Sequence, residues 1–323
     1  MKMKKMKKLI LILSLVFYLQ SCSQKPNLNK EEMIAEFTKN TPNSSIYNTH
    51  PQYRLEQYSS NCRWEIRLND MLLFLGEMSH TKKGSISNNS FWLNPYILHS
   101  GKQIITIKIY PVEGQKTLGE FATFRLIGLD FYPDKAKDNT NYQRLLSWDL
   151  PDKDVKDLPF LVIKKEFEAV VPYTNVGWEK SKDLTEIKDL DKMVIEKMKD
   201  LEKIMKDQNG IGHLNLTKKF LQEKYTCSYS NSKEIETDCN ELVSNFNADM
   251  KDIEEIEWYP YVNYELVFFG NGRIVSLRRR GESLNFYGPA YKGKWKDDKS
   301  DAEIWLDKFY HIPEGSNELE IIR

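Results

Sequence analysis

The first half of the chain contains short segments in which apolar and polar residues alternate. Alternation with a period of two is typical of a half-buried β-strand. Strands are predicted at residues 62–68, 71–75, 104–110, 121–127, 160–163 and 167–171. Asn69-Asp70 separates the first two segments and favours a hairpin. Several short strands divided by turn signals predict a β-sandwich over residues 49–178.

The second half begins with a helical pattern. Apolar residues recur there every three or four positions, which predicts an amphipathic helix. They are Ile187, Leu190, Val194, Met198, Leu201 and Met205. A shorter helix is expected at 216–224, and a third helix places Cys239, Leu242, Phe246, Met250 and Ile253 on one face.

Strands follow these helices. Residues 262–269 and 274–277 alternate on either side of Gly270-Asn271-Gly272, which predicts a second hairpin. Further strands are expected at 283–287, 303–309 and 319–322. Helices followed by an antiparallel sheet predict an α+β domain over residues 179–323. The expected fold class is therefore mixed, a β-sandwich followed by an α+β domain.

The amino-terminal segment has the pattern of a secretory signal. Residues 1–8 hold five lysines and no acidic residue, and residues 9–19 form an apolar run. The run ends in Leu19-Gln20-Ser21-Cys22, which resembles the lipobox of bacterial lipoproteins. The resemblance implies that residues 1–21 are removed and that Cys22 carries acyl chains such as palmitate, which anchor the protein to a membrane. The alternative is an ordinary signal peptide, with Cys22 joining a disulfide.

The residue after Cys22 bears on the compartment. An aspartate there favours inner-membrane retention in enterobacterial lipoproteins, whereas this chain has Ser23. By that family analogy we expect the outer membrane, with the body facing the periplasm or the cell surface. Residues 22–48 are rich in Asn, Ser, Lys, Thr and Pro and predict a lipidated tether, within which residues 30–37 can form a short helical turn.

One loop bears on the type of sandwich. Residues 93–103, Leu-Asn-Pro-Tyr-Ile-Leu-His-Ser-Gly-Lys-Gln, lead directly into the strand that begins near Ile104. This stretch resembles a loop of immunoglobulin-like domains, in which a turn with Pro and Gly precedes an outgoing strand. The resemblance implies an immunoglobulin-like fold and says nothing about activity.

Charge limits the classes of partner. The 323 residues contain 47 basic and 47 acidic residues, a formal net charge of +0. Removal of the five signal-peptide lysines leaves the rest of the chain at about −5, which argues against binding nucleic acid or anionic lipid through bulk charge.

Three cysteines remain if Cys22 is lipidated. Cys227 and Cys239 are twelve residues apart, and an oxidising compartment favours a disulfide between them. Cys62 is then left as a small buried side chain, although it could pair with either of the others. The spacings match neither a zinc site nor a Cys-x-x-Cys redox pair.

Sequence motifs for chemistry are sparse. The five histidines form no close ligand pair, so we expect no metal, and no phosphate-binding or dinucleotide-binding loop points to a cofactor. We therefore expect no catalytic residues. Arg278-Arg279-Arg280 is a candidate site for an anion or an acidic partner, or else a solvated strand end balanced by Glu282. Trp258 and Tyr261 are candidates for stacking on a partner, or else for packing at the start of a strand.

These observations favour a lipid-anchored, non-enzymatic envelope protein that binds another macromolecule, a protein or a glycan but no nucleic acid. A more specific hypothesis is an immunity lipoprotein that blocks an exported antibacterial toxin, which fits a basic patch on an acidic body. A third hypothesis is a glycan-binding or cell-wall-processing enzyme, whose carboxylate pair sequence reasoning cannot pick out.

Overall fold

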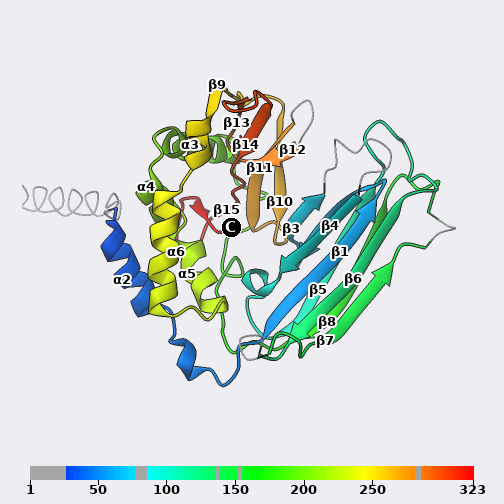
Figure 1. Ribbon diagram of the computed structural model, residues 1–323, viewed down its shortest axis with the longest axis horizontal. Coiled ribbons are helices and arrows are strands. Elements are labelled where there is room, and N and C mark those ends of the chain that lie inside the picture. Colours follow the sequence, from blue (N-terminus) through cyan, green and yellow to red (C-terminus); the bar gives the residue numbers. More distant parts are fainter. Residues whose placement is uncertain (1–26, 77–85, 135–137, 152–154, 281–284) are drawn as a thin grey trace, which may run out of the picture.

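The computed structural model describes residues 27–76, 86–134, 138–151, 155–280 and 285–323. Its fold is mixed, mostly antiparallel sheet with helices on one side (Figure 1). Cys22 and the lipobox lie outside the described residues. Within the described ranges, no helix is both long and apolar enough to cross a membrane.

Two four-stranded antiparallel sheets make up the first region. The first sheet has the strand order β4-β1-β6-β7 and the second has the order β3-β2-β5-β8. Their bounds are β1 Gln52–Ser60, β2 Arg63–Leu68, β3 Met71–Gly76, β4 Ile86–Trp92, β5 Gly101–Tyr110, β6 Thr123–Tyr132, β7 Gln143–Asp149 and β8 Leu161–Ala169. The predicted hairpin of residues 62–75 is confirmed as β2–β3, and the two predicted strands after residue 160 form one strand, β8.

The two sheets share one apolar core. Alternate side chains of the central strands point into it, as the period-two pattern requires. They include Leu55 on β1, Ile107 on β5 and Leu126 on β6, all with no exposed surface. Trp64 on β2 is the largest of the fully buried side chains. The sheets therefore pack face to face.

The second region combines helices with two smaller sheets. One sheet has the order β10-β11-β15-β16, with β12 paired to β11, and the other has the order β14-β13-β9. Their bounds are β9 Ile253–Trp258, β10 Tyr264–Phe269, β11 Ile274–Arg280, β12 Asn285–Tyr287, β13 Ala290–Trp295, β14 Asp301–Trp305, β15 Tyr310–His311 and β16 Glu320–Ile321. The hairpin predicted around Gly270–Gly272 is confirmed as β10–β11.

The helices lie beside these sheets, at the left of Figure 1. Their bounds are α2 Lys30–Asn40, α3 Leu190–Lys206, α4 Gly210–Leu216, α5 Lys218–Cys227 and α6 Ser232–Ser244, with 3₁₀ turns η1 Ser44–Ile46, η2 Asn94–Tyr96 and η3 Ala248–Asp252. α3 buries Val194, Met198 and Leu201, as its periodicity predicts. The third predicted helix is shorter than expected, because Asn245 ends α6 and Ile253 begins β9.

One helix lies where a tether was expected. The sequence predicts a tether over residues 22–48, but α2 begins with a capping box at Asn29 and Glu32 and buries Met33 and Phe37 completely. These two side chains pack against α4, α5 and α6, and the Phe37 ring meets that of Tyr225 edge-on at 5.2 Å. The segment from α2 onward therefore belongs to the folded body.

A second correction concerns the cysteines. Cys62, Cys227 and Cys239 are all buried free thiols in this structure, so the expected Cys227–Cys239 disulfide is not formed. The two thiols lie in different cores. Cys227 belongs to the core of the sandwich sheets and Cys239 to the core around α2. Sequence separation suited a bridge, but the fold sends the side chains in different directions.

The two regions meet along the second sandwich sheet. Met71, Leu72 and Leu98 from the sandwich pack with Phe269, Ile274 and Phe309 from the second region. Arg67 on β2 crosses the boundary as well. Its guanidinium bonds Glu65 and Asp70 and lies 4.6 Å from the Phe269 ring centre. An apolar contact with a buried charged group beside it therefore joins the regions.

Candidate functional site

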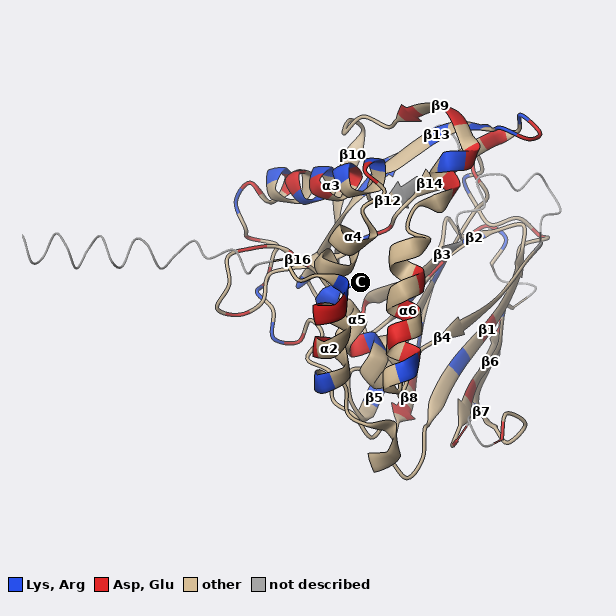
Figure 2. Cartoon of the chain, turned by 60° about the vertical axis from the view of Figure 1, so that its left-hand side comes forward, with Lys and Arg blue, Asp and Glu red and all other residues tan. Residues whose placement is uncertain are grey.

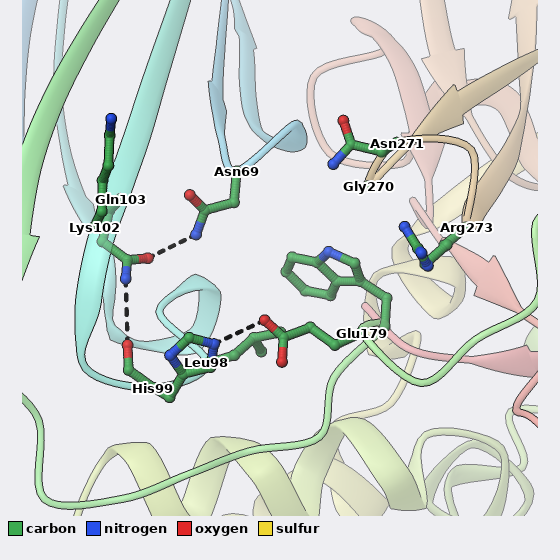
Figure 3. A pocket seen from close by; sticks show the side chains of 10 residues that line it. Asn69, Leu98, His99, Lys102, Gln103, Glu179, Gly270, Asn271 and Arg273 are labelled. Atoms are coloured by element: carbon green, nitrogen blue, oxygen red, sulfur yellow. Dashed lines mark hydrogen bonds and ion pairs between the residues drawn. The ribbon is translucent and has the colours of Figure 1, made fainter.

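A pocket of about 340 Å³ lies at this boundary, and we call it the junction pocket. Three parts of the chain line it: the β2–β3 turn with the start of β5, the segment after β8, and the β10–β11 turn (Figure 3). The lining residues are Asn69, Leu98, His99, Lys102, Gln103, Trp178, Glu179, Gly270, Asn271 and Arg273. Residues more than 200 positions apart thus share one cavity.

The sandwich side of the pocket is held by amides. Asn69 has a positive φ of 48° in the β2–β3 turn, a conformation that asparagine tolerates. Its side-chain amide donates to Gln103 Oε1 at 2.6 Å, and its Oδ1 accepts from the backbone of Ile104 at 3.0 Å. Gln103 is almost fully buried and donates to the carbonyls of His99 and Gly101. Internal hydrogen bonds therefore hold the side chains of this wall in place.

A histidine–carboxylate pair lies at the rim. His99 Nδ1 donates to the Ser100 carbonyl at 2.7 Å, and Nε2 lies 2.8 Å from Glu179 Oε1. Both contacts favour the doubly protonated ring, so the Ser100 carbonyl first and then Glu179 raise the pKa of His99. Both side chains are about half exposed, so water screens the pair and its stabilising effect is small.

The opposite wall carries a free cation. Arg273 follows the β10–β11 turn, and Figure 3 shows its guanidinium directed toward the cavity. Lys102 also lines the pocket, but its ammonium pairs with Glu166 at 2.7 Å. Among the described residues, the Arg273 side chain has neither a hydrogen bond nor an ion pair within 4 Å.

Trp178 forms the base of the pocket and is 4% exposed. A Cβ added to Gly270 would lie 2.7 Å from its Cδ1, and Gly270 has a φ of +58°. Both facts require glycine at that position. The close approach fixes the indole against the β10–β11 turn.

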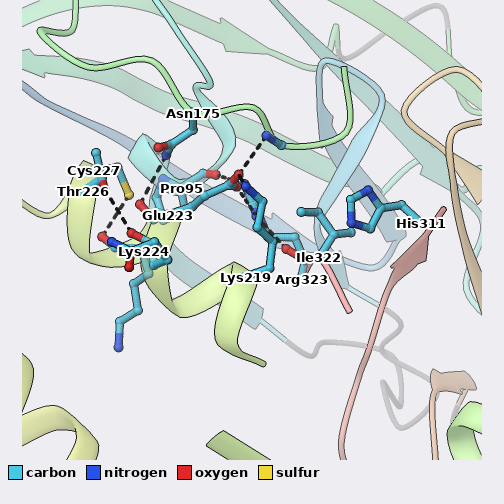
Figure 4. Close-up of polar contacts among 12 residues, drawn as sticks. Pro95, Asn175, Lys219, Glu223, Lys224, Thr226, Cys227, His311, Ile322 and Arg323 are labelled. Atoms are coloured by element: carbon cyan, nitrogen blue, oxygen red, sulfur yellow. Dashed lines mark hydrogen bonds and ion pairs between the residues drawn. The ribbon is translucent and has the colours of Figure 1, made fainter. Parts of the chain in front are cut away.

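A buried charged cluster contacts Trp178 through Arg323, and Figure 4 shows its polar contacts. The Arg323 guanidinium is 5.2 Å from the Trp178 ring centre and donates to Glu223 Oε2 at 3.2 Å and to the Pro95 carbonyl at 2.5 Å. Glu223 also accepts from the Gly177 amide at 2.8 Å and pairs with Lys219 at 3.2 Å. We call this group the Arg323 cluster. It ties α5 to the sandwich loop and to the segment that carries Trp178.

The arginines of the predicted patch point to different faces of β11. Arg278 is partly exposed and lies 3.6 Å from Glu265, whereas Arg279 is 2% exposed. Arg279 donates to the carbonyls of Tyr259 and Pro260, and burial lowers its pKa. Arg280 ends β11 and pairs with Asn285. The basic patch and the solvated strand end are both wrong for Arg279, because strand alternation turns it inward with Val275 and Leu277.

Trp258 and Tyr261 are packed against neighbours in the fold. Lys206 lies 4.8 Å above the Trp258 ring, and Tyr291 lies 4.8 Å from it. Tyr261 donates to Glu202 at 3.0 Å and has Arg279 4.6 Å from its ring centre. Together with Arg279 they connect α3 to the sheets, and they do not join the junction pocket.

A serine–histidine pair also becomes visible in the fold. Ser181 Oγ and His311 Nδ1 are 2.7 Å apart, but the two residues are 5% and 2% exposed. Burial lowers the pKa of His311 to about 4, so the ring is neutral near pH 7. A substrate cannot reach this pair, which instead links the segment after Trp178 to β15. Within the described residues, no group of three His, Cys, Asp or Glu side chains is placed to hold a metal.

Sequence reasoning did not find the junction pocket. Gly270-Asn271-Gly272 was recognised as a turn, but nothing in the sequence places that turn beside Asn69 and His99. Comparisons of the chain with protein-family models, with curated proteins and with solved structures find no match. The geometry therefore carries the functional argument. A preformed polar cavity with one free cation can bind a ligand without chemical change.

Proposed function

We propose that this chain is a lipid-anchored, non-enzymatic protein of the bacterial cell envelope, held at the outer membrane through Cys22, and that it binds a macromolecular partner at the junction pocket. The observation that carries the proposal is the cavity itself. Two regions distant in sequence and the segment between them form it, and its polar wall is organised by internal hydrogen bonds. Such preorganisation lowers the entropic cost of binding.

Mixed surface charge also fits a binding protein. Figure 2 colours the ribbon by residue type, and basic and acidic positions are interspersed along α3. α6 holds four acidic residues and one lysine, so neither helix is strongly basic as in nucleic-acid binders. The immunity hypothesis remains one form of the proposal, but the basic patch on which it drew is divided between Arg278 and Arg279.

The proposal extends to the fold of residues 49–178, which we assign to the immunoglobulin-like sandwiches. In that fold strand C pairs with F, F with G, and B with E, and a tryptophan on C is buried. Here β2 pairs with β5, β5 with β8 and β1 with β4, and Trp64 on β2 is fully buried. There are two departures. β6 pairs with β1 where the first strand A is expected, and β6 and β7 of the other sheet lie in sequence between β5 and β8, whereas F and G are consecutive strands.

Site-specific photo-crosslinking tests the binding function. A photoreactive residue at Asn271, on the pocket rim, should capture one stoichiometric partner from envelope extracts. The same residue at Lys199, an exposed position of α3, should not capture that partner. No capture at Asn271, or equal capture at both positions, would refute binding at the pocket.

Fractionation tests the anchor. The Cys22→Ala variant should lose lipidation and leave the membrane fraction for the soluble fraction, whereas the wild-type chain stays with membranes. Metabolic labelling with a palmitate analogue gives the direct readout. A Cys22→Ala chain that still fractionates entirely with membranes would disprove the anchor.

A further inference from the structure

We propose that the junction pocket recognises a carboxylate, namely an acidic side chain presented by a protein partner; the proposal rests on the binding function above and names its chemistry. Arg273, in the β10–β11 turn, is the anchoring residue.

The charges around the pocket single out Arg273. The other basic side chains nearby each have an acidic partner: Lys102 pairs with Glu166 at 2.7 Å, Arg67 with Asp70 at 2.9 Å, and His99, when protonated, with Glu179 at 2.8 Å. Arg273 has no such partner within the described part of the chain. The cavity therefore presents one positive charge that a ligand can neutralise.

Asp183 is the acid whose charge is coupled to that of Arg273. Hydrogen bonds from the Thr185 hydroxyl at 2.6 Å and the Thr185 backbone at 2.9 Å lower the pKa of Asp183, and the charge of Arg273 adds a smaller effect. Asp183 forms neither a hydrogen bond nor an ion pair within 4 Å with Arg273. The guanidinium fork thus keeps its donors, and two parallel N–H groups match a carboxylate better than any neutral group.

The size of the pocket limits the ligand. About 340 Å³ is near the lower end of ligand cavities in proteins. It accommodates one amino-acid side chain or one sugar ring and no extended polymer. A single inserted acidic side chain is the kind of anchor that dominates many protein interfaces.

The surroundings favour a protein over a glycan. Sugar rings stack on exposed aromatic faces, but Trp178 is covered by Gly270 on one side and Arg323 on another. The segment that leads into Trp178 exposes Val170 (66%) and Val176 (45%). The Asn175 backbone N–H donates to the carbonyl of Leu98, a pocket residue, at 2.7 Å, which holds this segment next to the pocket. Exposed apolar side chains on a segment that reaches the pocket suit contact with a protein surface.

Saturation-transfer NMR on the full chain in detergent provides the test. The probes are the capped peptides acetyl-Gly-Glu-Gly-amide and acetyl-Gly-Gln-Gly-amide, together with D-glucuronate and D-glucose. We expect the Glu peptide to bind at least about tenfold more tightly than the Gln peptide, because charge-assisted hydrogen bonds are stronger. Equal binding of the two peptides would overturn the proposal, and tighter binding of glucuronate than of the Glu peptide would overturn its protein source.

Variants locate the effect. Arg273→Gln should lower the affinity for the Glu peptide by about tenfold. The melting temperature should be unchanged, since the Arg273 side chain has no partner to lose. The matched control is Arg125→Gln, which removes an equally charged, exposed side chain from β6 and should leave affinity within about twofold. Unchanged binding in Arg273→Gln would refute the assignment of the anchor.

The two proposals fail separately. A partner crosslinked at Asn271 with equal yield in wild-type and Arg273→Gln chains would keep the binding function and reject the carboxylate. Charge-dependent binding of the Glu peptide without any crosslinked partner would reject the macromolecular function and keep a carboxylate site.

Discussion

Two arginines near Trp178 have opposite surroundings: Arg323 is enclosed, and Arg273 lines a cavity. Arg323 is 4% exposed at its side chain and is enclosed by Glu223, by backbone carbonyls and by three aromatic rings. Arg273, in contrast, faces a cavity and has no partner among the described residues. An enclosed charge is costly to disturb and contributes to structure, whereas an unsatisfied charge at a cavity is available to a ligand.

The largest effect is expected in the Arg323 cluster. Glu223→Gln keeps the shape of the side chain but leaves Arg323 buried without its counter-charge, which should destabilise the protein by about 3 kcal/mol. Urea unfolding measures the loss. The double variant Glu223→Leu/Arg323→Met should recover most of the stability. A loss of stability below about 1 kcal/mol in Glu223→Gln would mean that the buried charge of Arg323 does not depend on Glu223.

Gly270→Ala probes the wall that the two regions share. Both the positive φ and the contact with Trp178 oppose a Cβ, so we expect a loss of about 2–3 kcal/mol and a changed pocket. Gly315→Ala is the matched control. It has a φ of +82° but no atom within 4 Å of the added Cβ, so it should show the backbone strain alone, about 1 kcal/mol. Equal losses would show that the Trp178 contact is unimportant.

Acid should lower the free energy of unfolding through His311, which lies near the Arg323 cluster. His311 lies near Glu223, Lys219 and Arg323, and burial lowers its pKa from 6.5 to about 4. The unfolded chain therefore binds the proton more readily, and stability falls as the pH drops from about 6.5 through 4, by about 2 kcal/mol at pH 5. Chemical unfolding at pH 7 and pH 5 should show a smaller drop for His311→Gln than for wild type.

His99 gives a control of opposite sign at the pocket. Its pKa is raised in the folded protein, so its small contribution is complete below pH 6.5 and is lost as the pH rises above that value. His99→Gln should therefore leave the acid-induced drop no smaller than in wild type. An identical pH profile for wild type and His311→Gln would contradict the role given to burial.

The last prediction is that reduction of disulfides has no effect on stability. Cys227 lies beside the Arg323 cluster and donates to the Lys224 carbonyl, and it forms no bond to Cys239. In the Cys22→Ala chain, thiol titration after denaturation should find Cys62, Cys227 and Cys239 all free. A reducing agent should then leave the melting temperature unchanged. A stabilising disulfide would show as a missing pair of thiols.

Local patterns predicted the fold wherever the core face alternates with a solvated face. β5 and α3 are clear examples, because Ile105, Ile107 and Ile109 or Val194 and Met198 lie inside. β1 and β4 were not predicted. β1 turns Gln57 and Ser59 inward alongside Tyr53 and Leu55, so its sequence lacks the apolar signal on which period-two reasoning depends.

The candidate sites show the same limit. The inward direction of Arg279 was readable, since it shares its strand face with Leu277 and Val275. The junction pocket was not readable, because Asn69, His99 and Arg273 are ordinary polar residues until long-range packing brings them together. α2 was underestimated because its partners, such as Tyr225 and Leu214, come almost 200 residues later.

The attachment of α2 has a consequence for the distance between the body and the membrane. Just before it, the Leu28 backbone bonds the Asn215 side chain in both directions, at 3.0 and 2.9 Å, which fastens the start of the body to α4. An anchor at Cys22 would then be six residues from the fastening point, a reach of at most about 20 Å. The end of the body at α2 would therefore stay within that distance of the lipid headgroups, whatever direction the rest of the body takes.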